Sequence, residues 1–259
     1  MMNLIDSHAH IFLEHFDDDL DAVVDEAQRS GVKKILLPNI DSTTIDSMLR
    51  VERLYPDLCH SMIGLHPCSV KENYEEELRI VEEWLEKRSF VAIGEIGTDL
   101  YWDKTYWPEQ QKAFNAQCEL ALQYKLPVVI HCRESIDETI ELVMPFAKQG
   151  LKGVFHCFTG TVEQGDQIRS LGFCLGIGGV ATFKNGGMDK VLPKLGIDQL
   201  ILETDSPYLT PSPYRGKRNV PGYTSLVCER VAELLDMQPD LVAEATTKNC
   251  QDLFRIDGL

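Results

Sequence analysis

The stretch Asp6-Ser7-His8-Ala9-His10 ends the first apolar run of the chain and carries two histidines separated by one residue. Residues two apart on an extended segment point to the same side. His8 and His10 therefore form a two-armed clamp of imidazole nitrogens, which are common ligands of protein-bound metal ions. This stretch predicts a metal site at the end of the first strand.

Residues of the same kind recur where later apolar runs end. With His8 and His10 included, five of the 7 histidines lie at the ends of apolar runs, His66 among them. Histidines without a common role would not be expected to gather at the ends of the apolar runs, so the set indicates a single site. The motifs at the later run ends are Gly94-Glu95-Ile96-Gly97, His131-Cys132-Arg133, His156-Cys157-Phe158 and Glu203-Thr204-Asp205-Ser206-Pro207.

Apolar runs alternate with segments of helical periodicity along all 259 residues. We expect strands at 3–6, 34–37, 60–65, 90–93, 127–130, 153–155, 173–177 and 200–202. We expect helices at 17–30, 43–55, 74–87, 108–124, 135–147, 162–171, 188–195, 224–235, 239–245 and 249–254. Eight such repeats predict one α/β domain over residues 1–259, a (β/α)8 TIM barrel. Its metal site is expected at the C-terminal ends of the strands, where the chemistry of such barrels lies.

The candidate ligand set is larger than one catalytic zinc requires, because three protein ligands usually suffice. We therefore predict two divalent metal ions with one carboxylate between them. Mixed nitrogen and oxygen ligands suit Zn, Mn, Fe or Ni better than Mg alone, and they do not choose among these metals. Two such ions would acidify a shared water, for which Asp205 would act as ligand and general base. The six candidate ligands are His8, His10, Glu95, His131, His156 and Asp205.

Two further acids lie beside these ligands. Asp6 shares a strand face with His8, and Glu203 shares one with Asp205. Each acid either orients a metal ligand from behind or is a buried carboxylate paired to a base.

The candidate substrate contacts are basic. His66 follows the third strand, and Arg133 shares a strand face with His131, where its guanidinium suits a bidentate phosphate contact. A structural ion pair is the alternative for Arg133. Arg215 and Arg218 follow the eighth strand, where they would contact substrate or form part of a solvated face.

An aromatic segment, Tyr101-Trp102-Asp103-Lys104-Thr105-Tyr106-Trp107, follows the fourth strand. Its rings would either stack on unpaired bases or pack beneath the loop before Pro108, and the sequence favours packing.

The net charge of −16 opposes tight binding of duplex nucleic acid through a basic face. Two bound divalent cations would offset this charge locally. The 8 cysteines form no Cys-x-x-Cys pair, which is typical of reduced thiols in a cytosolic protein. The N-terminus lacks the features of a signal peptide, and no apolar stretch is long enough to span a membrane. We therefore expect a cytoplasmic protein without a membrane partner.

These motifs, in this order, resemble those of the TatD family of deoxyribonucleases within the amidohydrolase-like superfamily. The resemblance also covers Gly64-Leu65-His66-Pro67, Phe155-His156-Cys157-Phe158-Thr159-Gly160 and Arg215-Gly216-Lys217-Arg218-Asn219. It implies a (β/α)8 barrel and a cytosolic divalent-metal phosphodiesterase that trims the 3′ ends of DNA.

The family pattern implies how the ligands divide between the two ions. His8, His10, Glu95 and Asp205 would hold one ion. Glu95, His131 and His156 would hold the other. The chain departs from the family at Thr98, where Leu is common, but it keeps Asp99. This departure bears on substrate preference more than on chemistry.

Three functions follow from these observations. The first is metal-dependent hydrolysis of phosphodiester bonds in single-stranded DNA or DNA ends. The second keeps the metals and changes the bond to that of a small-molecule phosphoester, amide or lactone. Many such enzymes bridge their metals with a carboxylated lysine where this chain has Glu95, which argues against that subset. The third is a metal-binding protein without catalysis, against which the complete ligand set argues.

Overall fold

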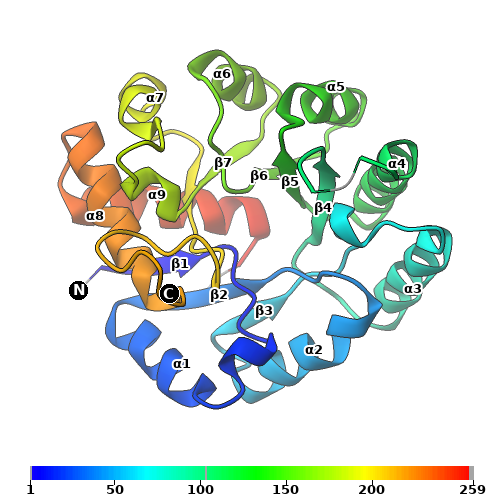
Figure 1. The fold of residues 1–259 in the computed structure, drawn as a ribbon, viewed down its shortest axis with the longest axis horizontal. Coiled ribbons are helices and arrows are strands. Elements are labelled where there is room, and N and C mark those ends of the chain that lie inside the picture. Colours follow the sequence, from blue (N-terminus) through cyan, green and yellow to red (C-terminus); the bar gives the residue numbers. More distant parts are fainter. Residues whose placement is uncertain (1, 103, 257–259) are drawn as a thin grey trace.

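The computed structural model describes residues 2–102 and 104–256 and contains eight parallel strands, with helices α1 to α8 around them (Figure 1). The strands are β1 (Leu4–Asp6), β2 (Val32–Leu37), β3 (Cys59–Ser61), β4 (Ile93–Asp99), β5 (Val128–Arg133), β6 (Gly153–Phe155), β7 (Cys174–Ile177) and β8 (Leu200–Leu202). The α-helices are α1 (Leu20–Arg29), α2 (Ile45–Leu54), α3 (Tyr74–Lys87), α4 (Trp107–Tyr124), α5 (Ile136–Ala147), α6 (Val162–Ser170), α7 (Met188–Leu195), α8 (Thr224–Leu235) and α9 (Pro239–Phe254).

The strands form two hydrogen-bonded groups in chain order, β1-β2-β3 and β4-β5-β6-β7-β8. Single parallel bridges connect the groups at both junctions, Ile63 to Ile93 between β3 and β4, and Ala9 to Ser206 between the ends of β1 and β8. Each strand therefore neighbours the next, and the last neighbours the first. This arrangement confirms the predicted (β/α)8 TIM barrel.

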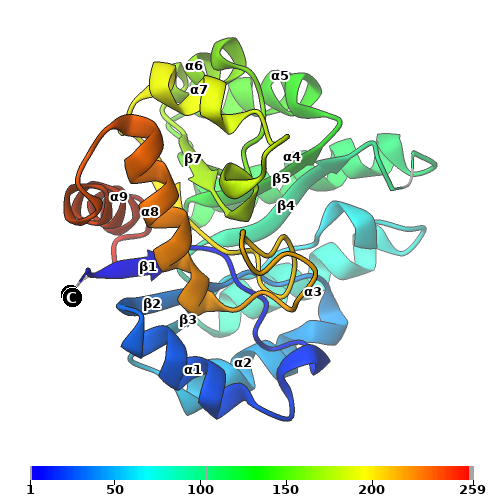
Figure 2. The ribbon, with the colours of Figure 1, turned by 60° about the vertical axis from the view of Figure 1, so that its left-hand side comes forward.

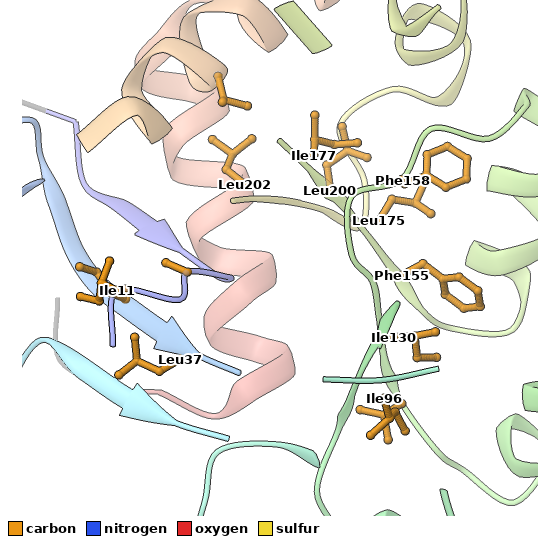
Figure 3. Close-up of a cluster of buried hydrophobic side chains, with 14 of the residues drawn as sticks. Ile11, Leu37, Ile96, Ile130, Phe155, Phe158, Leu175, Ile177, Leu200 and Leu202 are labelled. Atoms are coloured by element: carbon orange, nitrogen blue, oxygen red, sulfur yellow. The ribbon is translucent and has the colours of Figure 1, made fainter. Parts of the chain in front are cut away.

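The main core lies between the strands and the surrounding helices. Its strand residues include Ile96, Ile130 and Phe155, which Figure 3 shows on one side of neighbouring strands. Helices contribute an apolar face to the same core, such as Val23 and Ala27 of α1. Each large aliphatic or aromatic side chain fully buried here contributes about 1.5–3 kcal/mol to stability.

A second core fills the barrel interior, where the strands begin. It combines inward side chains such as Val129 and Ile201 with Cys250 and Phe254 of α9. Asn249 of α9 also donates a hydrogen bond to the carbonyl of Leu200 at the start of β8. In Figure 2, α9 lies at the end where the strands begin, and the loop after β8 lies at the end where they finish. Helix α9 thus covers the opposite end of the barrel from the strand ends that carry the candidate ligands.

Several elements differ from their predicted bounds by one to six residues; β3, for example, ends at Ser61 and not at residue 65. β4 and β5 extend to Asp99 and Arg133, because their ladder continues through the pair of Gly97 and His131. Glu95 and His131 therefore lie within strands and not after them. The last two predicted helices form one helix, α9, in which the Thr246 hydroxyl donates to the helical carbonyl of Val242.

The cysteines are all free thiols in this structure. In the part of the chain that the structure describes, no helix has the length and hydropathy that a membrane crossing requires.

Candidate metal centre

Five imidazoles converge on the carboxylate of Glu95, which is buried inside the barrel mouth on β4. They come from the ends of β1, β3, β5 and β6, so the barrel topology brings together residues that are far apart in the sequence. The distances are 3.1 Å from His8 Nε2 and 3.5 Å from His10 Nε2 to Oε2, and 3.0 Å from His131 Nδ1, 3.1 Å from His156 Nε2 and 3.4 Å from His66 Nε2 to Oε1.

Asp205 completes the group from the loop after β8. Its Oδ1 lies 3.5 Å from His10 Nε2 and 3.8 Å from His8 Nε2. Asp205 adopts a left-handed backbone (φ 58°), and its N–H donates to the carbonyl of His8, which fixes this loop against the end of β1. The side chain is 15% exposed, whereas that of Glu95 is 3% exposed. Of the two carboxylates, Asp205 is therefore the one that reaches the solvent side.

This arrangement fits divalent cations. His8 Nε2 faces His10 Nε2 at 3.2 Å as well as the Glu95 carboxylate at 3.1 Å. Burial lowers the pKa of His8, and the neighbouring His156 lowers it further, so His8 is a neutral ring with a lone pair to donate. Lone pairs that face one another repel unless a proton or a cation lies between them, and a cation relieves this repulsion for the whole group.

Three groups of side chains have ligand atoms close enough together to hold an ion. Their members are His8, His10 and Glu95; His8, His156 and Asp205; and His66, Glu95 and His131. All six ligands predicted from the sequence belong to these groups. Glu95 belongs to two of them, as a bridging carboxylate would.

The carboxylate of Glu95 and the surrounding imidazoles each stabilise the charged form of the other. Burial raises the pKa of Glu95, but His66, His8 and His156 outweigh it and hold that pKa well below the usual range. For His156, burial lowers the pKa, whereas Glu95 and Glu203 together raise it well above the usual value. Glu95 is therefore the central negative charge of the site.

Two carboxylates behind the ligands orient their rings. Glu203 Oε1 lies 3.3 Å from His156 Nδ1, so the Nε2 of this ring is directed at Glu95. Gly176 makes room for Glu203, because a Cβ on Gly176 would lie 2.3 Å from Glu203 Oε2. The role proposed for Glu203 from strand parity, that of orienting a ligand, agrees with this geometry.

Asp99 is the second orienting carboxylate; in the sequence it is a residue kept from the family pattern, but its contact with His131 was not predicted. Its Oδ2 lies 2.9 Å from His131 Nε2, which leaves Nδ1 of His131 to face Glu95. Burial raises the pKa of Asp99, but the bond to His131 and the backbone N–H groups of Trp102 and Tyr101 lower it to about 2. The missed signal was the length of β4, since extending that strand to Asp99 places the carboxylate beside β5.

Asp6 connects the backbone and does not contact a ligand side chain. It accepts hydrogen bonds from the N–H and hydroxyl of Thr204 and from the N–H of His8. Burial raises the pKa of Asp6 to about 8, and these hydrogen bonds oppose the shift. Asp6 therefore links β1 to the segment before Asp205, and no base pairs with it among the described residues.

A backbone hydrogen bond fixes the orientation of the His66 ring. Its Nδ1 accepts a hydrogen bond from the backbone N–H of Cys68 at 3.1 Å. Burial, the largest influence, lowers the pKa of His66 and favours the neutral ring, which must then carry its proton on Nε2. The Nε2 that faces Glu95 and the cavity is thus a hydrogen-bond donor in this structure, which distinguishes His66 from the six predicted ligands although it belongs to one of the three groups.

Replacing His66 by Ala is therefore expected to leave the number of bound metal ions unchanged. His131→Ala is the matched comparison, because Nδ1 of His131 faces Glu95 at 3.0 Å and the loss of this ring should remove one ion. Metal content after dialysis, measured by mass spectrometry beside thermal unfolding, distinguishes the two. Loss of an ion from the folded His66→Ala protein would make His66 a ligand.

A cavity of about 710 Å³ opens over this group. His66, Arg133 and Asp205 line it, as does Trp102 from the loop after β4. The Arg133 guanidinium lies 3.9 Å from the ring centre of Tyr101, and it is exposed. No carboxylate in residues 2–102 and 104–256 forms an ion pair with Arg133, so the alternative of a structural ion pair has no partner here.

The structure does not bring the other two arginines into the cavity lining. Arg218 pairs with Asp19 at 2.6 Å and covers the ring of Phe16. Arg215 lies over the ring of Phe183 and donates to the carbonyl of Thr210. These contacts hold the loop after β8 in place.

Thr98, the departure from the family pattern, does not face the cavity. Its hydroxyl is buried and lies 2.8 Å from the hydroxyl of Ser135 and 2.7 Å from that of Thr139 on α5. Thr98 therefore attaches β4 to α5.

Comparison with known proteins supports the assignment of this site as the metal centre of a hydrolase. The family model for TatD related DNase matches residues 5–255. An uncharacterized metal-dependent hydrolase, YabD of Bacillus subtilis, is 37% identical over 98% of this chain and 100% of its own length. The 3′-5′ ssDNA/RNA exonuclease TatD of Yersinia pseudotuberculosis is 33% identical over 93% of this chain and 95% of its own. The crystal structure of YjjV, a TatD homologue from Escherichia coli, superposes with a TM-score of 0.92 at 30% identity and covers 98% of both chains. The chain belongs to the TatD family of metal-dependent hydrolases.

Proposed function

We propose that this protein hydrolyses phosphodiester bonds and shortens single-stranded nucleic acid from its 3′ end, with two divalent ions. The observation that carries the proposal is the open cavity over the six converging ligand side chains. Five of them line it, together with an arginine that has no carboxylate partner among the described residues. Relatives named as 3′-5′ ssDNA/RNA exonucleases support the choice of substrate.

The side chains divide the work of hydrolysis. Glu95, placed between the imidazoles, would be shared by the two ions, which when bound acidify a water and neutralise charge on the phosphate. Asp205, at the solvent side, accepts the proton of the attacking water. A bond forms between the water oxygen and phosphorus while the bond to the leaving sugar oxygen breaks, and that oxygen takes up a proton from solvent to become a hydroxyl. The Nε2–H of His66 and the guanidinium of Arg133 donate to phosphate oxygens.

Incubation of 5′-labelled single-stranded DNA with Mg²⁺ or Mn²⁺ tests the proposal. The expected result is a ladder that shortens from the 3′ end, is abolished by a chelator, and is absent in the Asp205→Asn variant. Absence of cleavage by fully metal-loaded protein would contradict the nuclease. It would favour a small phosphoester, amide or lactone, which a cavity of about 710 Å³ can hold.

Arg133→Ala is expected to raise the KM for a phosphodiester about tenfold, because one charge-assisted phosphate contact is lost. Arg50→Ala is the matched control, since its guanidinium pairs with Asp17 at the surface, outside the cavity lining, and its KM should not change. Steady-state hydrolysis of bis(p-nitrophenyl) phosphate measures both. If Arg133→Ala loses metal at unchanged KM, Arg133 has a structural role instead.

A further inference from the structure

The loop between β4 and α4 exposes two aromatic rings beside the cavity. The exposed fraction is 66% for Trp102 and 48% for Tyr101. Their rings meet edge to face at a centroid distance of 5.0 Å. The sequence favoured packing of these rings beneath the loop, and the exposure of Tyr101 and Trp102 contradicts that prediction. Because exposure of a large aromatic ring forgoes the stability of burial, the pair calls for another explanation.

The two rings are held in place despite their exposure. The backbone N–H groups of Tyr101 and Trp102 both donate to Asp99 Oδ1 at 2.8 Å. Arg133 lies over both rings, 3.9 Å from the centre of Tyr101 and 5.2 Å from that of Trp102. Asp99 also binds His131 through its other oxygen. One carboxylate thus fixes the aromatic pair relative to a metal ligand.

This arrangement places side by side two groups that complement a nucleotide, an aromatic ring for its base and a guanidinium for its phosphate. A flat ring with most of its surface free matches a nucleobase, and the guanidinium of Arg133 matches a phosphate. Trp102 and Arg133 both line the cavity that contains Glu95 and Asp205. A strand whose phosphate lies at this group therefore places a neighbouring base within reach of the Trp102 ring. In a duplex that base is already stacked and paired, so only an unpaired base is available.

We propose that Trp102, supported by Tyr101 and Arg133, binds one unpaired nucleobase adjacent to the scissile phosphate and makes the enzyme selective for single-stranded ends. The inference rests on the proposed phosphodiesterase function and adds to it the determinant of strand selectivity. In this assignment Trp102 is a substrate-binding residue and has no part in proton transfer.

The test uses four 5′-labelled oligonucleotides. One is unmodified, and each of the other three carries a single abasic residue, at the last, the second-last or the third-last position from the 3′ end. For the wild type, kcat/KM is expected to fall about 5- to 150-fold when one particular position lacks its base. Trp102→Ala should cleave the unmodified strand at that same reduced rate and show no further loss at that position. On the strand that is abasic at that position, Trp102→Ala and the wild type should have the same kcat/KM.

Tyr214→Ala is the control, because Tyr214 is an exposed aromatic residue in the loop after β8 that does not line the cavity. Binding is measured separately by tryptophan fluorescence in the Asp205→Asn background, where an oligonucleotide should quench the signal unless Trp102 is replaced by Phe. An equal penalty for every abasic position in wild type and Trp102→Ala would overturn the inference. So would an equal loss of kcat/KM in Trp102→Ala on the unmodified strand and on every abasic strand. If the proposed function itself fails, the wild type cleaves none of the strands, which is a different result.

Discussion

Replacing Glu95 by Gln is expected to remove most of the bound metal and to lower phosphodiester hydrolysis by at least about 1,000-fold. Glu95 is buried and is the only carboxylate within 3.5 Å of all five converging imidazoles among the described residues. Gln has the same shape, so packing is retained while the negative charge is lost. The amide also places a donor where the ions need an acceptor. Metal content and kcat, measured on the same preparation, report both effects.

The control for this variant is Glu52→Gln. Glu52 is a carboxylate that pairs with Arg88 and accepts a hydrogen bond from the backbone of Ser61, away from the metal centre. Its replacement should leave metal content and kcat unchanged. If Glu95→Gln retained both ions and wild-type turnover, Glu95 would not bridge the site, and the ligands would have to be assigned differently.

Replacing Asp205 by Asn is expected to separate turnover from metal binding. The amide cannot accept the proton of the attacking water, and loss of a general base costs about 100- to 10,000-fold in rate. His8, His10 and Glu95 remain in contact with one another, so at most one ion should be lost per chain. The expected outcome is a kcat lowered at least about 1,000-fold in protein that retains at least one ion, because a ligand is weakened as well.

Metal titration followed by single-turnover hydrolysis checks this expectation. If excess Mn²⁺ restores the rate of Asp205→Asn to that of the wild type, Asp205 acts only as a ligand. If the variant turns over normally at every metal concentration, Asp205 has neither role, and the proton acceptor lies elsewhere in the cavity.

The barrel and its ligands could be predicted because they depend on local patterns. Repeated apolar runs define strands, and parallel strands in a barrel present their ends on one face, so His8, Glu95 and His156 had to lie near one another. Strand parity likewise placed Glu203 behind the ligands, where it contacts His156.

The remaining parts depend on details that no periodic pattern contains. Asp99 was missed because the apolar run of β4 ends at Ile93, whereas the ladder with β5 continues to Asp99. The role of Arg218 depends on its pairing with Asp19, which lies 199 residues earlier in the sequence. The exposure of Trp102 follows from hydrogen bonds of its backbone to Asp99, which a sequence does not reveal.

The central claim is that two divalent ions in this cavity hydrolyse phosphodiesters. The most direct measurement is the rate of bis(p-nitrophenyl) phosphate hydrolysis while metal-free protein is titrated with Mn²⁺, with bound metal counted per chain. We predict negligible hydrolysis without metal and a rate that rises to a plateau at two bound ions per chain. A rate independent of Mn²⁺, or no hydrolysis with two ions bound, would contradict the account.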